Sequence, residues 1–109
     1  MLNQPPELTR TGVLRRADEL ICKDRADDYG DAHANFTRIA RMWSAYLGRE
    51  IAAHDVANMM ALLKISRLAN QPTHYDSAVD LAGYAALGAE LAERELAMVK
   101  NSYPPVNPL

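Results

Sequence analysis

Residues 78–89 read AVDLAGYAALGA, and this stretch constrains the fold more than any other. Every residue in it is small or apolar except Asp80 and the hydroxyl-bearing Tyr84. This composition favours a helix that is buried on nearly all sides. A buried carboxylate without a partner costs several kcal/mol or takes up a proton. We therefore expect Asp80 to lie beside a cation.

Glycine and proline divide the chain around this stretch into helical segments. Apolar residues recur at helical spacing in four segments, at about 11–26, 32–47, 53–69 and 75–99. Gly30 and Gly48 are expected to end the first two helices, and Asp31 is expected to cap the second. Few residues are β-branched, and no strand is predicted. The chain reads as a single all-α domain, similar to a four-helix bundle, with its core at about 10–100 and extended arms at 1–8 and 101–109.

The composition of the 109-residue chain excludes several classes of protein. Its net charge of −2 gives no reason to expect binding to DNA or RNA, which would need a basic patch. No apolar run reaches the roughly 18 residues that a membrane span needs, and the first ten residues, MLNQPPELTR, lack the apolar core expected of a signal peptide. Cys22 is the single cysteine, so no internal disulfide can form, and we expect a cytoplasmic protein. His33, His54 and His74 show no metal-ligand spacing and are expected to be solvated at helix ends.

The third and fourth helices are expected to fold back on each other across a short turn at 70–73. Lys64 and Asp80 lie equally far along the chain from the centre of this turn, near Pro72. Because both helices rise about 1.5 Å per residue, these two side chains should meet. Arg67 and Asp76 should pair in the same way, one turn nearer the loop. The hairpin is therefore predicted to carry two acids and two bases at one end.

Two interpretations of this polar patch remain open. Asp76, Asp80 and Tyr84 follow at four-residue spacing and share a helix face. The two ion pairs could simply hold the hairpin in register. Alternatively, Asp76 and Asp80 could hold a divalent metal such as Mg²⁺, or Lys64 and Arg67 could hold a phosphate. The spacing alone does not choose between these interpretations.

A second polar concentration lies at residues 25–36, RADDYGDAHANF. Gly30 is explained as a helix stop and Asp31 as a helix cap. Neither role explains why other polar residues are concentrated in the same stretch. If the first helix ends beside the hairpin patch, three of them could form one wall of a ligand pocket. These three are Asp28, Tyr29 and Asn35.

Three motifs in this order resemble a family of small, largely uncharacterised proteins that is common in phages and prophages. They are the DYG turn at 28–30, the K-x-x-R pair of Lys64 and Arg67, and the D-x-x-GY pattern that runs from Asp80 to Tyr84. The resemblance covers about residues 12–92.

More distantly, the fourth helix resembles the all-α nucleoside triphosphate pyrophosphatases of the MazG-like and dUTPase-like kind. Those enzymes carry acidic residues on two antiparallel helices, bind magnesium and a nucleoside triphosphate, and usually work as dimers or tetramers. Asp76 and Asp80 stand where that group has its second acidic pair. The first motif of that group, E-E-x-x-E, has no counterpart, because this chain has Met59, Met60 and Leu63 there.

The resemblance implies a protein that handles a nucleotide or another phosphate-bearing small molecule, with Mg²⁺ as the expected cofactor. Whether the ligand is hydrolysed or only bound stays open. Residues expected to contact the ligand come from these motifs and from the start of the second helix: Asp28, Tyr29, Asn35, Lys64, Arg67 and Tyr84. Asp76 and Asp80 are the expected metal ligands. The alternative is a non-enzymatic helical interaction module in which the charged cluster is structural.

The third and fourth helices carry apolar residues on more than one face, which predicts a homodimer or a higher homo-oligomer. The small residues Gly83, Ala86, Ala89 and Ala92 would let two copies approach closely. In such a dimer, the DYG turn of one chain could complete the Lys64–Asp80 patch of the other.

Overall fold

The computed structural model describes residues 8–24 and 31–102, and within these ranges it contains helices and no strand. Helix α1 spans Arg10–Glu19 and continues into a π-helical turn, η1, at Leu20–Asp24. The remaining helices are α3 at Ala32–Leu47, α4 at Ala53–Asn70 and α5 at Tyr75–Ser102. The all-α prediction is confirmed, and the last three helices start and end within three residues of their predicted bounds. The predicted stop at Gly30 lies outside the described residues.

The ends of α3 follow the chemistry that the sequence indicates. The Oδ1 atom of Asp31 accepts a hydrogen bond from the backbone N–H of His33 at 3.1 Å, which satisfies one of the donors left free in the first turn. At the other end, Gly48 takes a left-handed conformation with φ of 67°. Glycine adopts this conformation without steric cost, so the helix stops there.

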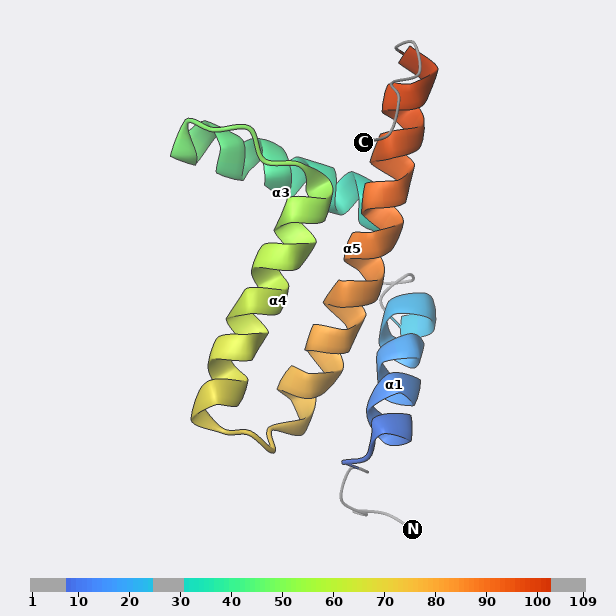
Figure 1. Ribbon diagram of the computed structural model, residues 1–109, viewed down its shortest axis with the longest axis vertical. Coiled ribbons are helices and arrows are strands. Elements are labelled where there is room, and N and C mark those ends of the chain that lie inside the picture. The colour runs from blue at the N-terminus through green and yellow to red at the C-terminus, as the bar shows by residue number, and fades with distance from the viewer. Residues whose placement is uncertain (1–7, 25–30, 103–109) are drawn as a thin grey trace, which may run out of the picture.

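The centre of the fold is the antiparallel hairpin of α4 and α5 (Figure 1). Helix α1 lies beside the lower half of α5, whereas α3 crosses the hairpin at the end away from the loop (Figure 1). Helix α3 therefore does not run alongside the other three helices as it would in a regular four-helix bundle. None of the described helices is both long and apolar enough to cross a membrane.

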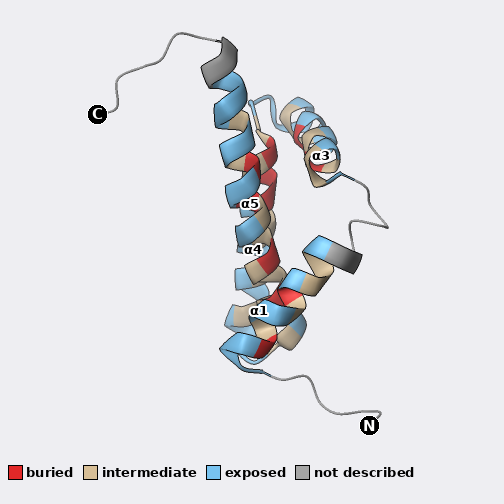
Figure 2. Ribbon diagram, turned by 90° about the vertical axis from the view of Figure 1, so that its right-hand side faces the viewer, coloured by how far each residue is buried: buried red, intermediate tan, exposed pale blue. Residues whose placement is uncertain are grey.

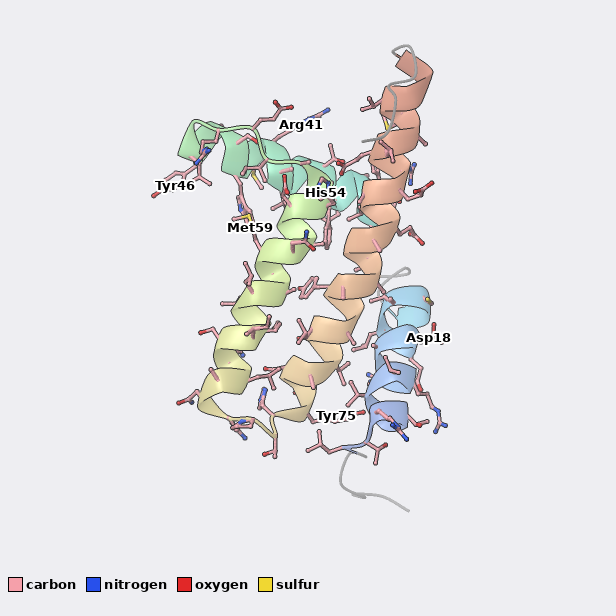
Figure 3. The ribbon with its side chains drawn as sticks, in the orientation of Figure 1. Asp18, Arg41, Tyr46, His54, Met59 and Tyr75 are labelled. Atoms are coloured by element: carbon pink, nitrogen blue, oxygen red, sulfur yellow. The ribbon has the colours of Figure 1, made fainter. Side chains whose placement is uncertain are left out.

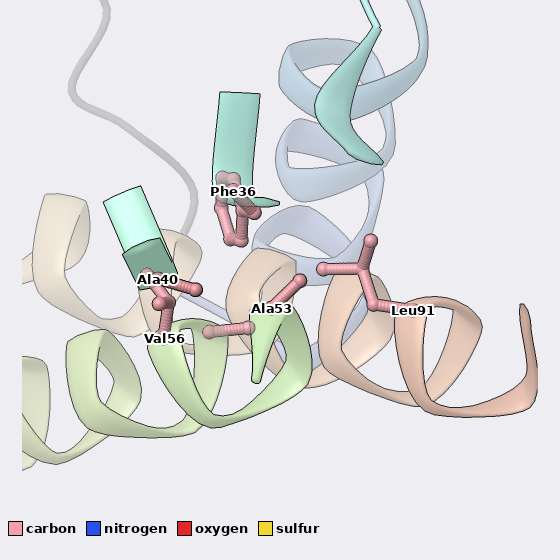
Figure 4. Packing of buried hydrophobic residues seen from close by; sticks show 6 residues of the cluster. Phe36, Ala40, Ala53, Val56 and Leu91 are labelled. Carbon is pink, nitrogen blue, oxygen red and sulfur yellow. The ribbon is translucent and has the colours of Figure 1, made fainter. Parts of the chain in front are cut away.

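The core lies where α3 crosses the hairpin (Figure 4). Its buried side chains are mostly small: Phe36, Ala40, Ala53, Val56, Ala57 and Leu91. Gly88 of α5 faces the same region, and a Cβ atom there would lie 3.1 Å from Asn58 Oδ1 and 3.4 Å from Ala57 Cβ. The missing side chain thus lets α4 and α5 pack closely at this level.

Helix α5 is less enclosed than its composition predicts. Figure 2 shows exposed residues along its length, and Ala85, Ala86 and Ala89 are among them. Only part of its surface faces α1, α3 and α4, so the prediction of burial on nearly all sides is wrong. Gly83 is buried against η1, where an added Cβ would lie 3.2 Å from Ile21 Cγ2. The prediction that Gly83 faces a second copy is therefore also wrong, because η1 of the same chain covers it.

Candidate functional site

Lys64 of α4 and Asp80 of α5 form the ion pair that the hairpin geometry predicts. The Lys64 Nζ atom lies 3.0 Å from Asp80 Oδ2, and the two side chains are only 14% and 21% exposed. A short contact with this much burial is screened less by solvent than a surface pair. The cation expected beside Asp80 is thus Lys64, and the predicted register of α4 against α5 is confirmed.

Tyr84 follows Asp80 by one helical turn and connects the ion pair to the core. Its ring lies 6.4 Å, centroid to centroid, from the ring of Phe36, in a tilted arrangement. Tilted aromatic pairs at this distance stabilise their contact beyond simple burial. Tyr84 also packs against the buried cluster under α3. Its ring therefore has a structural role in addition to any contact with a ligand.

A narrow crevice lies between α1, η1 and α5 beside Asp80 and Tyr84. Six apolar residues complete its lining: Ala17, Leu20, Ile21, Val79, Gly83 and Leu87. Its free volume is about 10 Å³, about the space that one water molecule needs. Pockets for small organic ligands measure roughly 300–1,000 Å³. This crevice therefore cannot hold a nucleotide.

Arg67 and Asp76 do not form the second ion pair. Both side chains are exposed, and no ion pair joins them within the described part of the chain. Arg67 lies in the last turn of α4 and Asp76 in the first turn of α5. Each charge already interacts favourably with its own helix end, and an exposed pair adds little. The predicted pairing is therefore wrong.

The remaining predicted ligand contacts are dispersed. Asp28 and Tyr29 lie outside the described residues. Asn35 is half-buried in the first turns of α3, and its backbone N–H donates to the Asp31 carbonyl at 3.1 Å. Because α3 crosses the hairpin far from its loop (Figure 1), Asn35 and Arg67 lie toward opposite ends of the hairpin. The structure brings Lys64, Asp80 and Tyr84 together but does not bring Asn35 to Arg67.

The two predicted metal ligands differ in their surroundings. The carboxylate of Asp80 contacts the Lys64 ammonium at 3.0 Å, whereas Asp76 is exposed to solvent. Over residues 8–24 and 31–102, no three or more His, Cys, Asp or Glu side chains gather closely enough to hold a metal ion. A metal at Asp76 and Asp80 would therefore need further oxygen ligands from a bound phosphate or from water.

A polar cluster that the sequence did not predict ties the start of α4 to the far end of α5. Glu95 accepts a hydrogen bond from the backbone N–H of His54 at 3.0 Å, and its other oxygen lies 2.8 Å from His54 Nδ1. On the other side of the ring, His54 Nε2 lies 3.4 Å from Asp55 Oδ1. Asp55 in turn accepts from the Ala52 N–H at 2.9 Å. Two carboxylates thus cap the N-terminus of α4, where negative charge is favourable.

The position of Glu95 explains why sequence counting did not find it. Counting outward from Pro72 pairs His54 with Glu90, but Glu90 is exposed. Side chains on a helix tilt toward its N-terminus, so Glu95 reaches back by about one turn to meet His54. His54 lies at the junction of α3, α4 and α5 (Figure 3). It is half-buried and hydrogen-bonded, so the prediction of a solvated histidine is wrong there.

His74 caps the other helix of the hairpin. The backbone N–H of Ser77 donates to His74 Nδ1 at 3.3 Å, and the buried Ser77 hydroxyl lies 2.6 Å from the same nitrogen. The imidazole therefore takes the place of the usual hydroxyl or carboxylate N-cap. His74 is half-buried, so its expected full solvation is also wrong. Its place at a helix end is confirmed.

Comparison with known proteins places the chain in a family. Residues 12–92 match the family described as "Domain of unknown function (DUF6378)". The chain is 50% identical over 76 residues to the Gene 55 protein of Mycobacterium phage L5, which covers 69% of this chain and 49% of that protein. It is 45% identical over 73 residues to the Gene 55 protein of Mycobacterium phage D29, which covers 67% and 48%.

The chain thus spans about half the length of these curated relatives. No solved structure matches it. The matched residues contain the whole α4–α5 hairpin up to Ala92, including Lys64, Arg67 and Asp80. The family match covers most of the chain, and both relatives named above come from phages. The protein therefore belongs to the DUF6378 family and has relatives among phage proteins.

Proposed function

We propose that the protein binds a nucleotide or another phosphate-bearing small molecule at the α4–α5 hairpin and does not hydrolyse it. The observation that carries this proposal is that the guanidinium of Arg67 is exposed and has no carboxylate partner in the described part of the chain. A guanidinium presents a planar set of donors that matches a phosphate group.

We do not propose hydrolysis, and the reason lies in the arrangement of the acidic residues Asp76 and Asp80. Mg²⁺ bound by Asp76 and Asp80 would neutralise charge on a bound phosphate. Asp80, however, is already paired with Lys64 at 3.0 Å, so a metal would have to displace the ammonium. The glutamate motif of the MazG-like pyrophosphatases, which this chain resembles distantly, is also missing from α4. The available residues therefore fit Mg²⁺ poorly, and binding alone is the better-supported activity.

A thermal-shift measurement tests the binding proposal. We expect at least one member of a panel of nucleoside mono-, di- and triphosphates to raise the Tm. At about ten times its Kd, a ligand that binds only the folded state adds about 1.4 kcal/mol of stability. For a domain of this size, this corresponds to a rise of about 6 °C. The rise should persist with EDTA, since no metal is needed for binding.

Two outcomes would contradict parts of this proposal. If no nucleotide raises the Tm, nucleotide binding is wrong. If pyrophosphate or phosphate is released when Mg²⁺ is present, the protein is a hydrolase, and the MazG-like interpretation should be adopted. The matching nucleosides, which lack phosphate, serve as the control and should leave the Tm unchanged.

A second candidate function is a helical interaction module that assembles as a homo-oligomer. The observation that favours it is the apolar side of α4 that the rest of the chain leaves open. Four side chains on α4 are more than a third exposed: Met59, Leu62, Leu63 and Ile65. Leu62 reaches 64% exposure, and Met59 projects from the side of α4 away from α5 (Figure 3). A second copy packed against this side would remove these residues from water.

Measurement of the mass in solution tests self-association. Light scattering at micromolar concentration should give at least twice the 12.1 kDa of a single chain. Replacing Leu62 by lysine should restore the single-chain mass without unfolding the protein, because the side chain is exposed. The matched control is Leu14→Lys on α1, which has 62% exposure and should remain oligomeric. A folded wild-type protein of about 12 kDa would refute this candidate.

A further inference from the structure

We propose that the phosphate group binds in an open depression at the loop end of the hairpin, on Arg67 and His74, and not beside Asp80. This inference rests on the proposed function and specifies its subsite. The depression has a volume of about 360 Å³. Ser66, Arg67, Asn70, Gln71 and His74 line it. Its size is at the lower end of the range for small-ligand pockets, and far exceeds that of the crevice beside Asp80.

The lining of this depression is suited to an anion. It contains a guanidinium, an imidazole, two carboxamides and a hydroxyl, and it contains no carboxylate. Every one of these groups can donate a hydrogen bond. Asp76 lies two residues beyond His74, but it is exposed and does not line the depression. Lys64 is paired with Asp80, so Arg67 supplies the positive charge within the lining of the depression.

The capping bond of His74 determines which of its nitrogens can donate to a ligand. A backbone N–H can only donate, so the 3.3 Å contact from Ser77 requires Nδ1 to be the acceptor. In the neutral ring, the proton then lies on Nε2. His74 thus combines two functions, because Nδ1 caps α5 while Nε2 remains as a donor for a bound phosphate oxygen.

Two-dimensional NMR with inorganic phosphate tests this subsite. At constant ionic strength, phosphate should shift the Nε–H signal of Arg67 and the side-chain amide signals of Asn70 and Gln71. Chloride at the same ionic strength should not shift them. Arg67→Gln should weaken phosphate binding by about tenfold or more, as expected for loss of a charged hydrogen-bond donor. The matched control is Arg41→Gln, an exposed arginine on α3 (Figure 3), which should bind phosphate normally.

A second variant separates the cap from the ligand contact. Asparagine is a good N-cap, so His74→Asn should keep the Tm while it removes the Nε2 donor. Phosphate binding should weaken severalfold in this variant. If phosphate binding is the same in the wild type, Arg67→Gln and His74→Asn, the subsite is wrong.

The outcome for the subsite can be separated from the outcome for the proposed function. If nucleotides raise the Tm but move no signals of Arg67, Asn70 or Gln71, the subsite is wrong and nucleotide binding stands. If inorganic phosphate moves these signals while no nucleotide raises the Tm, the subsite stands as a site for free phosphate. In that case, nucleotide binding is wrong.

Discussion

Replacing Asp80 by leucine is expected to lower the free energy of unfolding by about 2 kcal/mol, because it leaves the largely buried Lys64 side chain without its partner. Removing one partner of a fully buried pair costs roughly 3–5 kcal/mol, and exposed pairs contribute about 0–1 kcal/mol. The 14% and 21% exposure of these side chains places this pair between the two cases. Lys64→Met should cost a similar amount.

The double variant Lys64→Met/Asp80→Leu should be within about 1 kcal/mol of the wild type, since two apolar side chains can replace an ion pair. Urea unfolding of the four proteins gives the coupling energy directly. Arg67→Met is the matched control on α4, and it should change stability by less than about 0.5 kcal/mol because Arg67 is exposed. Additive effects of the two substitutions would show that Lys64 and Asp80 do not depend on each other.

The same Lys64 and Asp80 variants also test whether the ion pair contacts the ligand. If the double variant remains folded and still binds nucleotides, the ion pair only fixes the hairpin register. Loss of binding in a folded double variant would instead place Lys64 or Asp80 in contact with the ligand. The subsite at Arg67 predicts the first result, because that depression does not include either residue.

Replacing Glu95 by alanine should have an effect of similar size, about 2 kcal/mol. Glu95 is the carboxylate that accepts from both the His54 backbone N–H and its ring. Hydrogen bonds to a charged group contribute about 1.5–3 kcal/mol, and the carboxylate also stabilises the N-terminus of α4. Urea unfolding measures the loss, and faster hydrogen exchange at the His54 amide should accompany it.

The matched control for Glu95 is Glu93→Ala on the same helix, where the side chain is exposed. This variant should lie within about 0.5 kcal/mol of the wild type. Equal effects of the two substitutions would mean that the general negative charge of α5 is important and that the bond to His54 is not. Glu95→Gln should give an intermediate value, because it keeps an acceptor for the N–H but loses the charge.

Much of the fold could be predicted because it depends on local chemistry. Apolar spacing located α3, α4 and α5, and the caps at Asp31 and Gly48 act within a single turn of chain. The Lys64–Asp80 pair could be predicted because a short turn forces two rigid helices into one register. Of the candidate ligand residues, Lys64, Asp80 and Tyr84 lie together, whereas Asn35 lies far from Arg67.

Other features depended on tertiary structure. Counting along two helices treats each side chain as a point at its Cα atom, so it paired Arg67 with Asp76 and missed the reach of Glu95 back to His54. Counting along the helices also could not predict which side chains are buried, because burial depends on where α1 and α3 lie. The π-helical turn η1 covers Gly83 of α5 and α3 crosses the far end of the hairpin, so one side of α4 stays open.

The amino-acid sequence by itself determined the helices, their caps and the register of the hairpin, since these arise from backbone geometry and from contacts between neighbours in the chain. Only the tertiary structure decided which helix faces are covered and which polar groups meet. Those outcomes depend on the packing of residues far apart in sequence, as the 41-residue separation of His54 and Glu95 illustrates. The open depression at Arg67 is of the same kind, because it exists only where the ends of two helices come together around their loop.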